Sequence, residues 1–406
     1  MTFEIPSAAT PEEVGFSSQR LQRLTDALKR DVDHGAIPGA VLLLARRGKI
    51  VCHEAVGLRD REAGAAMQRD ALFRVYSMTK PVTSVAAMML AEEGALSIAD
   101  PVAAYLPEFA KLKVAVDSDG TAATELKAEP LRRAMTVQDL LRHTSGLTYA
   151  HLTGPQLKKA YEAADIGDDQ TNTAMVTKLA QVPLAYQPGT TFQYGFSTDV
   201  LGAVVEVASG LTLDRFFAAR ICAPLGMTDT GFGPAAAARL AEPQIDEATG
   251  TRPPLRDPVK KPVWLSGGSG LLSTATDYWR FCQMLLNGGE LGGARLLSPK
   301  TVALMTSDHL PPKVAYGPQM RTMFGALAPV PEHGIGFGLG FGVRTHVGRS
   351  PLPGSVGDYS WTGVSGTYFW NDPREQLIAI LLTQAPNERL HYRYLMRAMV
   401  YAAIED

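Results

Sequence analysis

The first sixty residues carry the hydrophobic spacing of a helix followed by two strands. Leucines recur every three or four positions over 17–33, which predicts an amphipathic helix that ends near Gly35. Apolar runs at 40–45 and 50–57 are separated by the turn-forming residues 46–49, which predicts an antiparallel pair of strands. The chain is therefore expected to open with a helix and a β-hairpin.

The stretch 82–90 is different because it is apolar on nearly every side. A helix of this kind belongs in the middle of a fold, and Gly94 is a natural stop signal after it. Pro81 is tolerated in the first turn, since the N–H groups there have no partner within the helix. We expect a central, buried helix with Ser77 at its N-terminal end.

Helical spacing dominates the middle of the chain, and strand patterns return near its end. The predicted helices are 136–142, which starts with the capping box Thr136–Asp139, and 156–179, 197–208, 213–222 and 274–287. The predicted strands are 338–343, 365–370 and 376–383, the last two joined as a hairpin by 372–375. A final helix is predicted over 387–403.

Strands at both ends of the chain and helices between them predict an α/β + α fold. One antiparallel sheet, flanked by helices and built from both termini, would carry an inserted, mainly helical domain. We predict a discontinuous α/β domain of residues 1–100 and 260–406, and a helical insert of residues 101–259. The length of 406 residues suits this organisation, because single hydrophobic cores stop growing at about 250–300 residues.

Charge and composition exclude several classes of function. The formal net charge is −2 and the basic residues are scattered, which argues against a nucleic-acid or anionic-membrane partner. Apolar runs of 18 residues are absent, so no membrane span is predicted, and the first residues carry acids and prolines where a signal peptide would be basic and then apolar. The three cysteines, Cys52, Cys222 and Cys282, lack metal-ligand spacing. We expect a cytoplasmic protein with reduced cysteines and no metal site.

Ser77 and Lys80 are a candidate nucleophile and base. Residues three apart on a helix are neighbours, so their side chains can meet. The unpaired N–H groups at the helix start stabilise negative charge on the serine or its adduct, and a neutral amine beside it can accept the hydroxyl proton. Taken alone, these residues fit a helix-capping serine beside a solvated lysine equally well.

Together with later motifs, Ser77-Met-Thr-Lys80 resembles the serine β-lactamase and penicillin-binding-protein superfamily, whose S-x-x-K signature it repeats. Tyr194-Gly-Phe196 matches the Tyr-x-Asn motif of class C enzymes in its tyrosine, and Trp361-Thr-Gly363 stands where Lys-Thr-Gly is expected. Supporting stretches typical of this superfamily are 141–147, 187–190 and 266–270. The changes at 196 and 361 make the chain resemble family VIII carboxylesterases, and it is also similar to related fungal acyltransferases. A G-x-S-x-G elbow, which would favour an α/β-hydrolase, is absent.

The resemblance implies a role for each motif residue. Ser77 would be the nucleophile, Lys80 its proton acceptor, and Tyr194 the group that relays the proton to the leaving alcohol. The N–H groups of Ser77 and Val364 would form the oxyanion hole. Residues implied in substrate binding are Trp361, Gly363 and Phe196, whereas His143 is assigned to structure because lysine and tyrosine leave no role for an imidazole.

The expected function is hydrolysis of small, short-chain carboxylic esters through an acyl-enzyme on Ser77, without a cofactor and with little or no β-lactamase activity. Acyl transfer, or D-amino-peptidase or β-lactamase chemistry, on the same residues is the alternative within enzymes. A sensor that binds β-lactam-like ligands is the non-enzyme alternative. The natural ester, the preferred acyl length and the oligomeric state remain open at this point.

Overall fold

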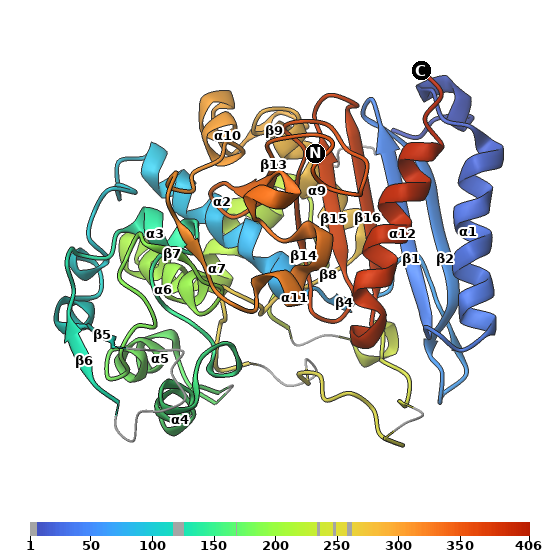
Figure 1. The fold of residues 1–406 in the computed structure, drawn as a ribbon. Coiled ribbons are helices and arrows are strands. Elements are labelled where there is room, and N and C mark those ends of the chain that lie inside the picture. Colours follow the sequence, from blue (N-terminus) through green and yellow to red (C-terminus); the bar gives the residue numbers. More distant parts are fainter. Residues whose placement is uncertain (1–5, 117–125, 168, 234–235, 247–248, 258–261) are drawn as a thin grey trace.

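The fold is built on one antiparallel sheet of eight strands, in the order β12-β13-β14-β15-β16-β1-β2-β3 (Figure 1). The computed structural model describes residues 1–406 except 1–5, 117–125, 168, 234–235, 247–248 and 258–261. The N-terminal strands are β1 (Gly39–Arg46), β2 (Lys49–Asp60) and β3 (Ala65–Ala66). The C-terminal strands are β12 (Ile335–Phe337), β13 (Gly342–Arg344), β14 (Tyr359–Thr362), β15 (Tyr368–Asp372) and β16 (Leu377–Thr383). The predicted sheet, drawn from both ends of the chain, is therefore confirmed.

Strand β1 is buried along its whole length because helices cover both faces of the sheet. Its residues alternate between two hydrophobic cores, with Val41 and Leu43 in one and Leu42 and Leu44 in the other, as the alternation of side chains along a strand requires. Helix α9 (Ala275–Leu286) packs on one face. Helices α1 (Ser18–Asp33) and α12 (Arg389–Ala402) lie side by side on the other (Figure 1).

Helix α2 (Thr79–Glu92) is buried in the larger core, as its apolar sequence predicts. It packs against α6 (Ser197–Ser209), so it joins the sheet to the helical part of the molecule (Figure 1). The other helices are α3 (Val137–Leu141), α4 (Pro155–Ala163), α5 (Asn172–Leu179), α7 (Leu213–Phe217), α8 (Ala223–Leu225), α10 (Pro299–Met305) and α11 (Met320–Phe324). Helices α3 to α8 fall inside the predicted insert 101–259, whose exact boundaries stay a prediction.

Four short strand pairs tie the loops together. They are β4 (Phe73–Arg74) with β8 (Leu272–Ser273), β5 (Lys113–Ala115) with β6 (Ala128–Pro130), β7 (Thr191–Phe192) with β11 (Ala315–Tyr316), and β9 (Glu290–Leu291) with β10 (Ala294–Arg295). The β4–β8 pair holds the chain immediately before Ser77. Among the described helices, none has the length and apolar character that crossing a membrane requires.

Three of the predicted segments are wrong in detail. The predicted helix 156–179 is two helices, because Thr171 caps α5 by accepting a hydrogen bond from the Ala174 N–H. Within the predicted strand 338–343, residues 338–341 form a turn that joins β12 to β13, closed by a hydrogen bond from Gly338 N–H to the Phe341 carbonyl, and residues 342–343 begin β13. The predicted strand 365–370 begins at residue 368, and β14, which carries Trp361, was missed.

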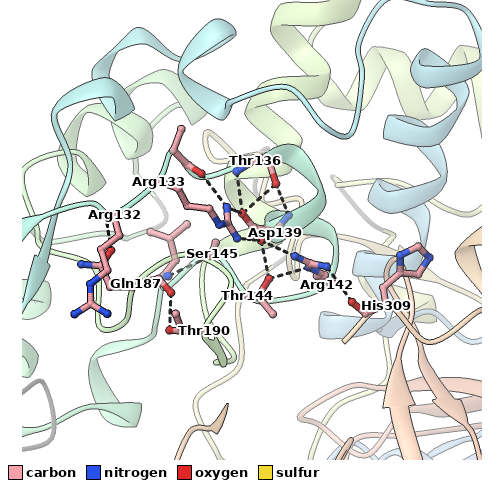
Figure 2. Close-up of polar contacts among 12 residues, drawn as sticks. Arg132, Arg133, Thr136, Asp139, Arg142, Thr144, Ser145, Gln187, Thr190 and His309 are labelled. Carbon is pink, nitrogen blue, oxygen red and sulfur yellow. Dashed lines mark hydrogen bonds and ion pairs between the residues drawn. The ribbon is translucent and has the colours of Figure 1, made fainter. Parts of the chain in front are cut away.

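The buried carboxylate of Asp139 fixes the loop that follows α3 (Figure 2). It accepts hydrogen bonds from Arg133 Nη2 at 2.9 Å, from Arg142 Nη2 at 3.0 Å and from Thr144 Oγ1 at 2.9 Å. It also completes the predicted capping box with Thr136. One carboxylate therefore sets the path of residues 142–144, which bring His143 to the site described below.

Asp139→Asn is expected to lower the free energy of unfolding by about 3 kcal/mol, since breaking a buried ion pair leaves the arginines without their counter-charge. Burial raises the pKa of Asp139, but hydrogen bonds from Arg133 and from the Thr136 N–H lower it on balance. A carboxyl with a depressed folded pKa gives stability that is present above its unfolded pKa of about 3.9 and is lost as the pH falls through the folded value. The difference in the free energy of unfolding between Asp139→Asn and wild type should therefore be fully present at neutral pH and should shrink below about pH 4.

Urea unfolding between pH 3.5 and 7 measures this difference. Asp165→Asn is the matched control, because the Asp165 side chain is exposed and its ion pair with Lys178 contributes little. An Asp139→Asn protein that unfolds at the same urea concentration as wild type at pH 7 would contradict the role given to this carboxylate.

Candidate active site

Ser77 lies in a 3-10 turn, Tyr76–Met78, that leads directly into α2. The residue before it, Tyr76, has a φ of 45°, a left-handed conformation that is uncommon for a bulky residue and tends to be found at functional sites. Contacts that hold the turn include the Tyr278 hydroxyl, which donates to the Met78 carbonyl at 2.9 Å, and the Arg256 N–H, which donates to the Tyr76 hydroxyl at 3.2 Å. Ser77 does not cap α2, whose N-cap is Met78. Its hydroxyl is directed to Lys80 instead.

Lys80 is buried, with 1% of its surface exposed, and its Nζ lies 3.1 Å from Ser77 Oγ. The same nitrogen donates to the Gly268 carbonyl at 2.7 Å and lies 4.6 Å from the centroid of the Tyr194 ring. A neutral amine in this position can donate to Gly268 and still offer its lone pair to the Ser77 hydroxyl. An activated nucleophile requires a base within hydrogen-bond reach and a third group that orients this base. Here Lys80 is the base, and the Gly268 carbonyl orients it.

Tyr194 precedes α6 and is buried against Trp361 of β14. The indole Nε1–H donates to the Tyr194 hydroxyl oxygen at 3.3 Å, and the two rings are 5.6 Å apart. A donor aimed at this oxygen stabilises a phenolate more than a neutral phenol, because hydrogen bonds to ionised acceptors are stronger. Trp361 therefore acts on Tyr194, while its own side chain is only 3% exposed.

Trp361→Phe is expected to lower kcat for ester hydrolysis about tenfold, which corresponds to one hydrogen bond to a charged group. Trp370→Phe is the matched control, because Trp370 is equally buried in the neighbouring strand β15 and its Nε1–H has no hydrogen-bond partner among the described residues. Both variants remove a similar side-chain volume. Steady-state kinetics, measured beside thermal unfolding, therefore separates the loss of the hydrogen bond from the loss of packing. Equal kcat values in the two variants would mean that the Trp361 indole N–H does not assist catalysis.

The loop 266–270 is held by Asp199 of α6. This buried carboxylate accepts hydrogen bonds from Ser266 Oγ and, at 3.0 Å, from the Gly268 N–H. Burial raises its pKa, and the nearby Lys80 opposes that effect. A Cβ on Gly268 would lie 2.5 Å from Asp199 Oδ2, so a larger residue there would displace this carboxylate. Asp199 thus positions the carbonyl that receives Lys80, a role that the sequence did not reveal because Asp199 and Gly268 are far apart in the chain.

A cavity of about 500 Å³ opens above these residues. Of the predicted site residues, Ser77, Tyr194 and Val364 line it, and Lys80 lies beneath. Its wall is mostly apolar or aromatic and includes Tyr76, Tyr149, Leu152, Met323 and Phe324. Most of these residues were not predicted, because they come from separate segments and share no local motif.

Three residues predicted to bind substrate, Trp361, Gly363 and Phe196, are not among the residues that line the cavity. Phe196 packs edge-on against Tyr149, with ring centroids 4.7 Å apart. Gly363 donates its N–H to the Thr367 carbonyl at 2.8 Å, and a Cβ there would lie 2.0 Å from Thr367 Oγ1. In this structure the three residues support the cavity wall from behind, and Gly363 sets the path of the chain into Val364.

His143 is buried beside the site, with its ring 4.8 Å from that of Tyr194. Burial, and then the charge of Lys80, hold its pKa well below its ordinary value, so the imidazole is neutral. The edges of Phe192 and Phe337 also meet this ring. The ring is thus packed among aromatic residues, its Nδ1 has no hydrogen-bond partner among the described residues, and the structural role of His143 stays a prediction. In the described part of the chain, no group of three His, Cys, Asp or Glu residues is placed to hold a metal ion.

Comparison with known proteins places this chain in a family. The family model described as Beta-lactamase matches residues 24–400. The chain belongs to the beta-lactamase family. This beta-lactamase-family protein is 39% identical over 367 residues to Protein Rv1367c of Mycobacterium tuberculosis, with 88% of each chain covered. It is 32% identical over 413 residues to Esterase EstB of Burkholderia gladioli, covering 94% of this chain and 95% of the relative.

A solved structure, "EstCE1, a hydrolase with promiscuous acyltransferase activity", has the same fold as this beta-lactamase-family protein. The TM-score is 0.77 at 27% sequence identity, with 94% of this chain and 98% of that chain covered. The predicted superfamily is confirmed, and the similarity to EstB and EstCE1 is consistent with a family VIII esterase. The relatives named as an esterase and a hydrolase also support the prediction of a carboxylesterase-type enzyme.

Proposed function

We propose that this protein hydrolyses short-chain carboxylic esters through an acyl-enzyme on Ser77. The observation that carries the proposal is the contact between Ser77 Oγ and the buried amine of Lys80, at the base of an apolar cavity that Tyr194 also lines. The similarity to EstB and EstCE1 supports the same class of reaction.

The first step is attack of Ser77 Oγ on the ester carbonyl. Lys80 takes the hydroxyl proton as the new C–O bond forms, and the carbonyl oxygen gains the negative charge of the tetrahedral intermediate. The backbone N–H groups of Ser77 and Val364 are the proposed donors to that oxygen. A lost donor of this kind typically costs about 3–4 kcal/mol in transition-state stabilisation.

The second step breaks the bond to the leaving alcohol. Tyr194 gives its proton to the departing oxygen and regains a proton from Lys80, so the proton taken from Ser77 leaves with the alcohol. Water then attacks the acyl-enzyme with Tyr194 or Lys80 as its base, and the acid departs as the Ser77 hydroxyl is restored. Lys80 Nζ lies 4.6 Å from the centroid of the Tyr194 ring, so the two groups of the proposed proton path are neighbours.

The cavity favours esters over β-lactams. Its aromatic and aliphatic wall provides apolar contact for short acyl and alcohol groups. Trp361 stands where related β-lactamases have the lysine that helps hold the drug's carboxylate, and Phe196 stands where they have an asparagine. A lost charge-assisted hydrogen bond is worth roughly 1.5–3 kcal/mol, or about tenfold to a hundredfold in kcat/KM.

The test compares 4-nitrophenyl butyrate with a chromogenic cephalosporin. We expect kcat/KM to be about a hundredfold higher for the ester, with measurable but weak opening of the lactam. A preference for the cephalosporin would mean that this is a β-lactamase and that the esterase proposal is wrong.

Acyl transfer is the second candidate, and the similarity to EstCE1, whose title names promiscuous acyltransferase activity, favours it. An added alcohol can replace water in attacking the same acyl-enzyme. Formation of butyl butyrate when n-butanol is added to the ester assay would show transfer, and its absence at high butanol concentration would leave hydrolysis alone.

A further inference from the structure

Val364 lies in the turn between β14 and β15, at the wall of the cavity. A hydrogen bond from the Gly366 N–H to the Gly363 carbonyl at 3.3 Å closes this turn. Within the described part of the chain, the Val364 N–H has no backbone hydrogen-bond partner, so it is available to a bound carbonyl oxygen. Its position relative to Ser77 depends on contacts between two segments that are far apart in the sequence.

Two hydroxyl groups provide such contacts. Ser365 Oγ donates to the Arg74 carbonyl at 3.2 Å. Thr367 Oγ1 donates to the Val75 carbonyl, also at 3.2 Å. The same Val75 carbonyl accepts the backbone hydrogen bond, 3.0 Å long, that closes the 3-10 turn of Ser77. Both hydroxyls belong to fully buried residues, and together they tie the turn between β14 and β15 to the segment of the nucleophile.

Gln384 directly follows β16 and holds Ser365 in place. The buried Gln384 amide donates from Nε2 to Ser365 Oγ at 3.1 Å and to the Thr383 carbonyl at 2.9 Å. Because a carbonyl oxygen only accepts hydrogen bonds, the amide nitrogen must face it, and the Ser365 hydroxyl is left to donate to Arg74. The Ala385 N–H adds a backbone hydrogen bond to the Ser365 carbonyl at 2.7 Å.

We propose that these three residues, Ser365, Thr367 and Gln384, form an oxyanion clamp. The clamp is a set of positioning residues that holds the backbone N–H groups of Ser77 and Val364 at a fixed separation for the developing oxyanion. It acts through the backbone alone, because none of the three residues lines the cavity. Donors to an oxyanion are effective when they are already in place, and a displacement of about 1 Å can cost about a hundredfold in rate. The proposal rests on the esterase function proposed above and names the side chains on which the geometry of that site depends.

Thr367→Val tests the clamp by removing one hydroxyl while keeping the shape of the side chain. We expect kcat for 4-nitrophenyl butyrate to fall about tenfold and KM to stay within about twofold, because a displaced oxyanion donor weakens binding of the transition state and not of the substrate. Thr367→Ser, which keeps the hydroxyl, should retain most of the wild-type kcat. Thr306→Val is the matched control, since the Thr306 hydroxyl also donates to a backbone carbonyl, that of Val302 at 2.9 Å, and does not line the cavity.

Ser365→Ala repeats the test on the other hydroxyl, so the result does not depend on the folding of one variant. It should lower kcat about tenfold as well, again with KM nearly unchanged. Ser209→Ala is its control, because the Ser209 hydroxyl donates to the Val205 carbonyl at 2.7 Å within α6 and lies outside the cavity wall. Thermal unfolding of each variant shows whether the fold is retained.

Binding of 1-butaneboronic acid gives a readout that does not require turnover. Ser77 Oγ adds to the boron atom, its proton passes to Lys80, and both hydroxyl groups stay on boron, so one of them can occupy the place of the oxyanion. We expect the dissociation constant, measured by isothermal titration calorimetry, to rise about tenfold in Thr367→Val and to keep its wild-type value in Thr306→Val.

Three outcomes would overturn the clamp. Equal kcat and equal boronate affinity in Thr367→Val and Thr306→Val would mean that the Thr367 hydroxyl does not position the donors. A raised KM at unchanged kcat would mean that it serves substrate binding instead. An equal loss in Thr367→Val and Thr367→Ser would mean that the shape of the side chain matters and the hydroxyl does not.

Failure of the esterase function would look different. If wild type hydrolysed no ester, and Thr367→Val still weakened boronate binding about tenfold, the proposed function would be wrong and the clamp would stand.

Discussion

Ser77→Ala is expected to lower kcat/KM for 4-nitrophenyl butyrate by at least about 10⁴-fold, as the loss of a covalent nucleophile does in other serine hydrolases. The free energy of unfolding should change by less than about 1 kcal/mol. Ser77 makes no capping hydrogen bond to α2, and its hydroxyl contacts only the Lys80 amine among the polar groups described. The loss would therefore lie in the chemistry and not in the fold.

Ser84→Ala is the matched control for this variant. Ser84 is a buried serine of α2, the helix that follows Ser77, and it does not line the cavity. Its variant should keep the activity of wild type. Comparable turnover by a folded Ser77→Ala protein would end the assignment of Ser77 as nucleophile.

Lys80→Met and Tyr194→Phe should each lower kcat by about 10²–10⁴-fold, the usual contribution of a positioned acid or base. The double variant should be little worse than the poorer single variant, because groups that act on one proton path are not additive. Methionine fills the space of Lys80 without a buried amine, so the fold should be retained. Lys49→Met, at a half-exposed lysine of β2 outside the site, controls for the loss of charge.

A double-mutant cycle on kcat, with circular dichroism to check the fold, measures the coupling between Lys80 and Tyr194. Losses that multiply in the double variant would mean that the two residues act independently and would contradict the shared proton path. In that case the Lys80 amine and the Tyr194 phenol would have separate roles in catalysis.

The sequence predicts those parts of the site that depend on local spacing. Ser77 and Lys80 are three residues apart at the start of an apolar helix, so the helix itself brings them together. The hairpin of β1 and β2 and the capping box at Thr136 are predictable for the same reason, since neighbours in the chain determine them. Tyr194 and Val364 were placed by resemblance to a family rather than by any local rule.

The parts that could not be predicted depend on contacts between distant segments. The hydrogen bond from Trp361 to Tyr194 joins residues 167 positions apart, and that from Gly268 to Asp199 joins residues 69 apart. Strand β14 has only four residues and follows a stretch rich in glycine and proline, so its pattern is too short to stand out. The contact of Trp361 with Tyr194 therefore comes from the structure, and contact of Trp361 with substrate stays a prediction.

The unpaired arginines of α12 were also out of reach of the sequence. Arg389, Arg393 and Arg397 share one face of the helix and look alike in the sequence, but within the described part of the chain only Arg397 of the three forms an ion pair, with Asp358 of a distant loop. Which of the three keeps an unsatisfied charge depends on which residues face the helix after folding.

The most direct test of the central claim is the site at which an acyl-like inhibitor becomes attached. The protein would be treated with ethyl 4-nitrophenyl methylphosphonate, digested, and mapped by mass spectrometry. Our account predicts one phosphonyl group per chain, on the peptide that contains Ser77, and no labelling of the folded Ser77→Ala protein. Stoichiometric labelling of another residue, or equal labelling of Ser77→Ala, would contradict the account.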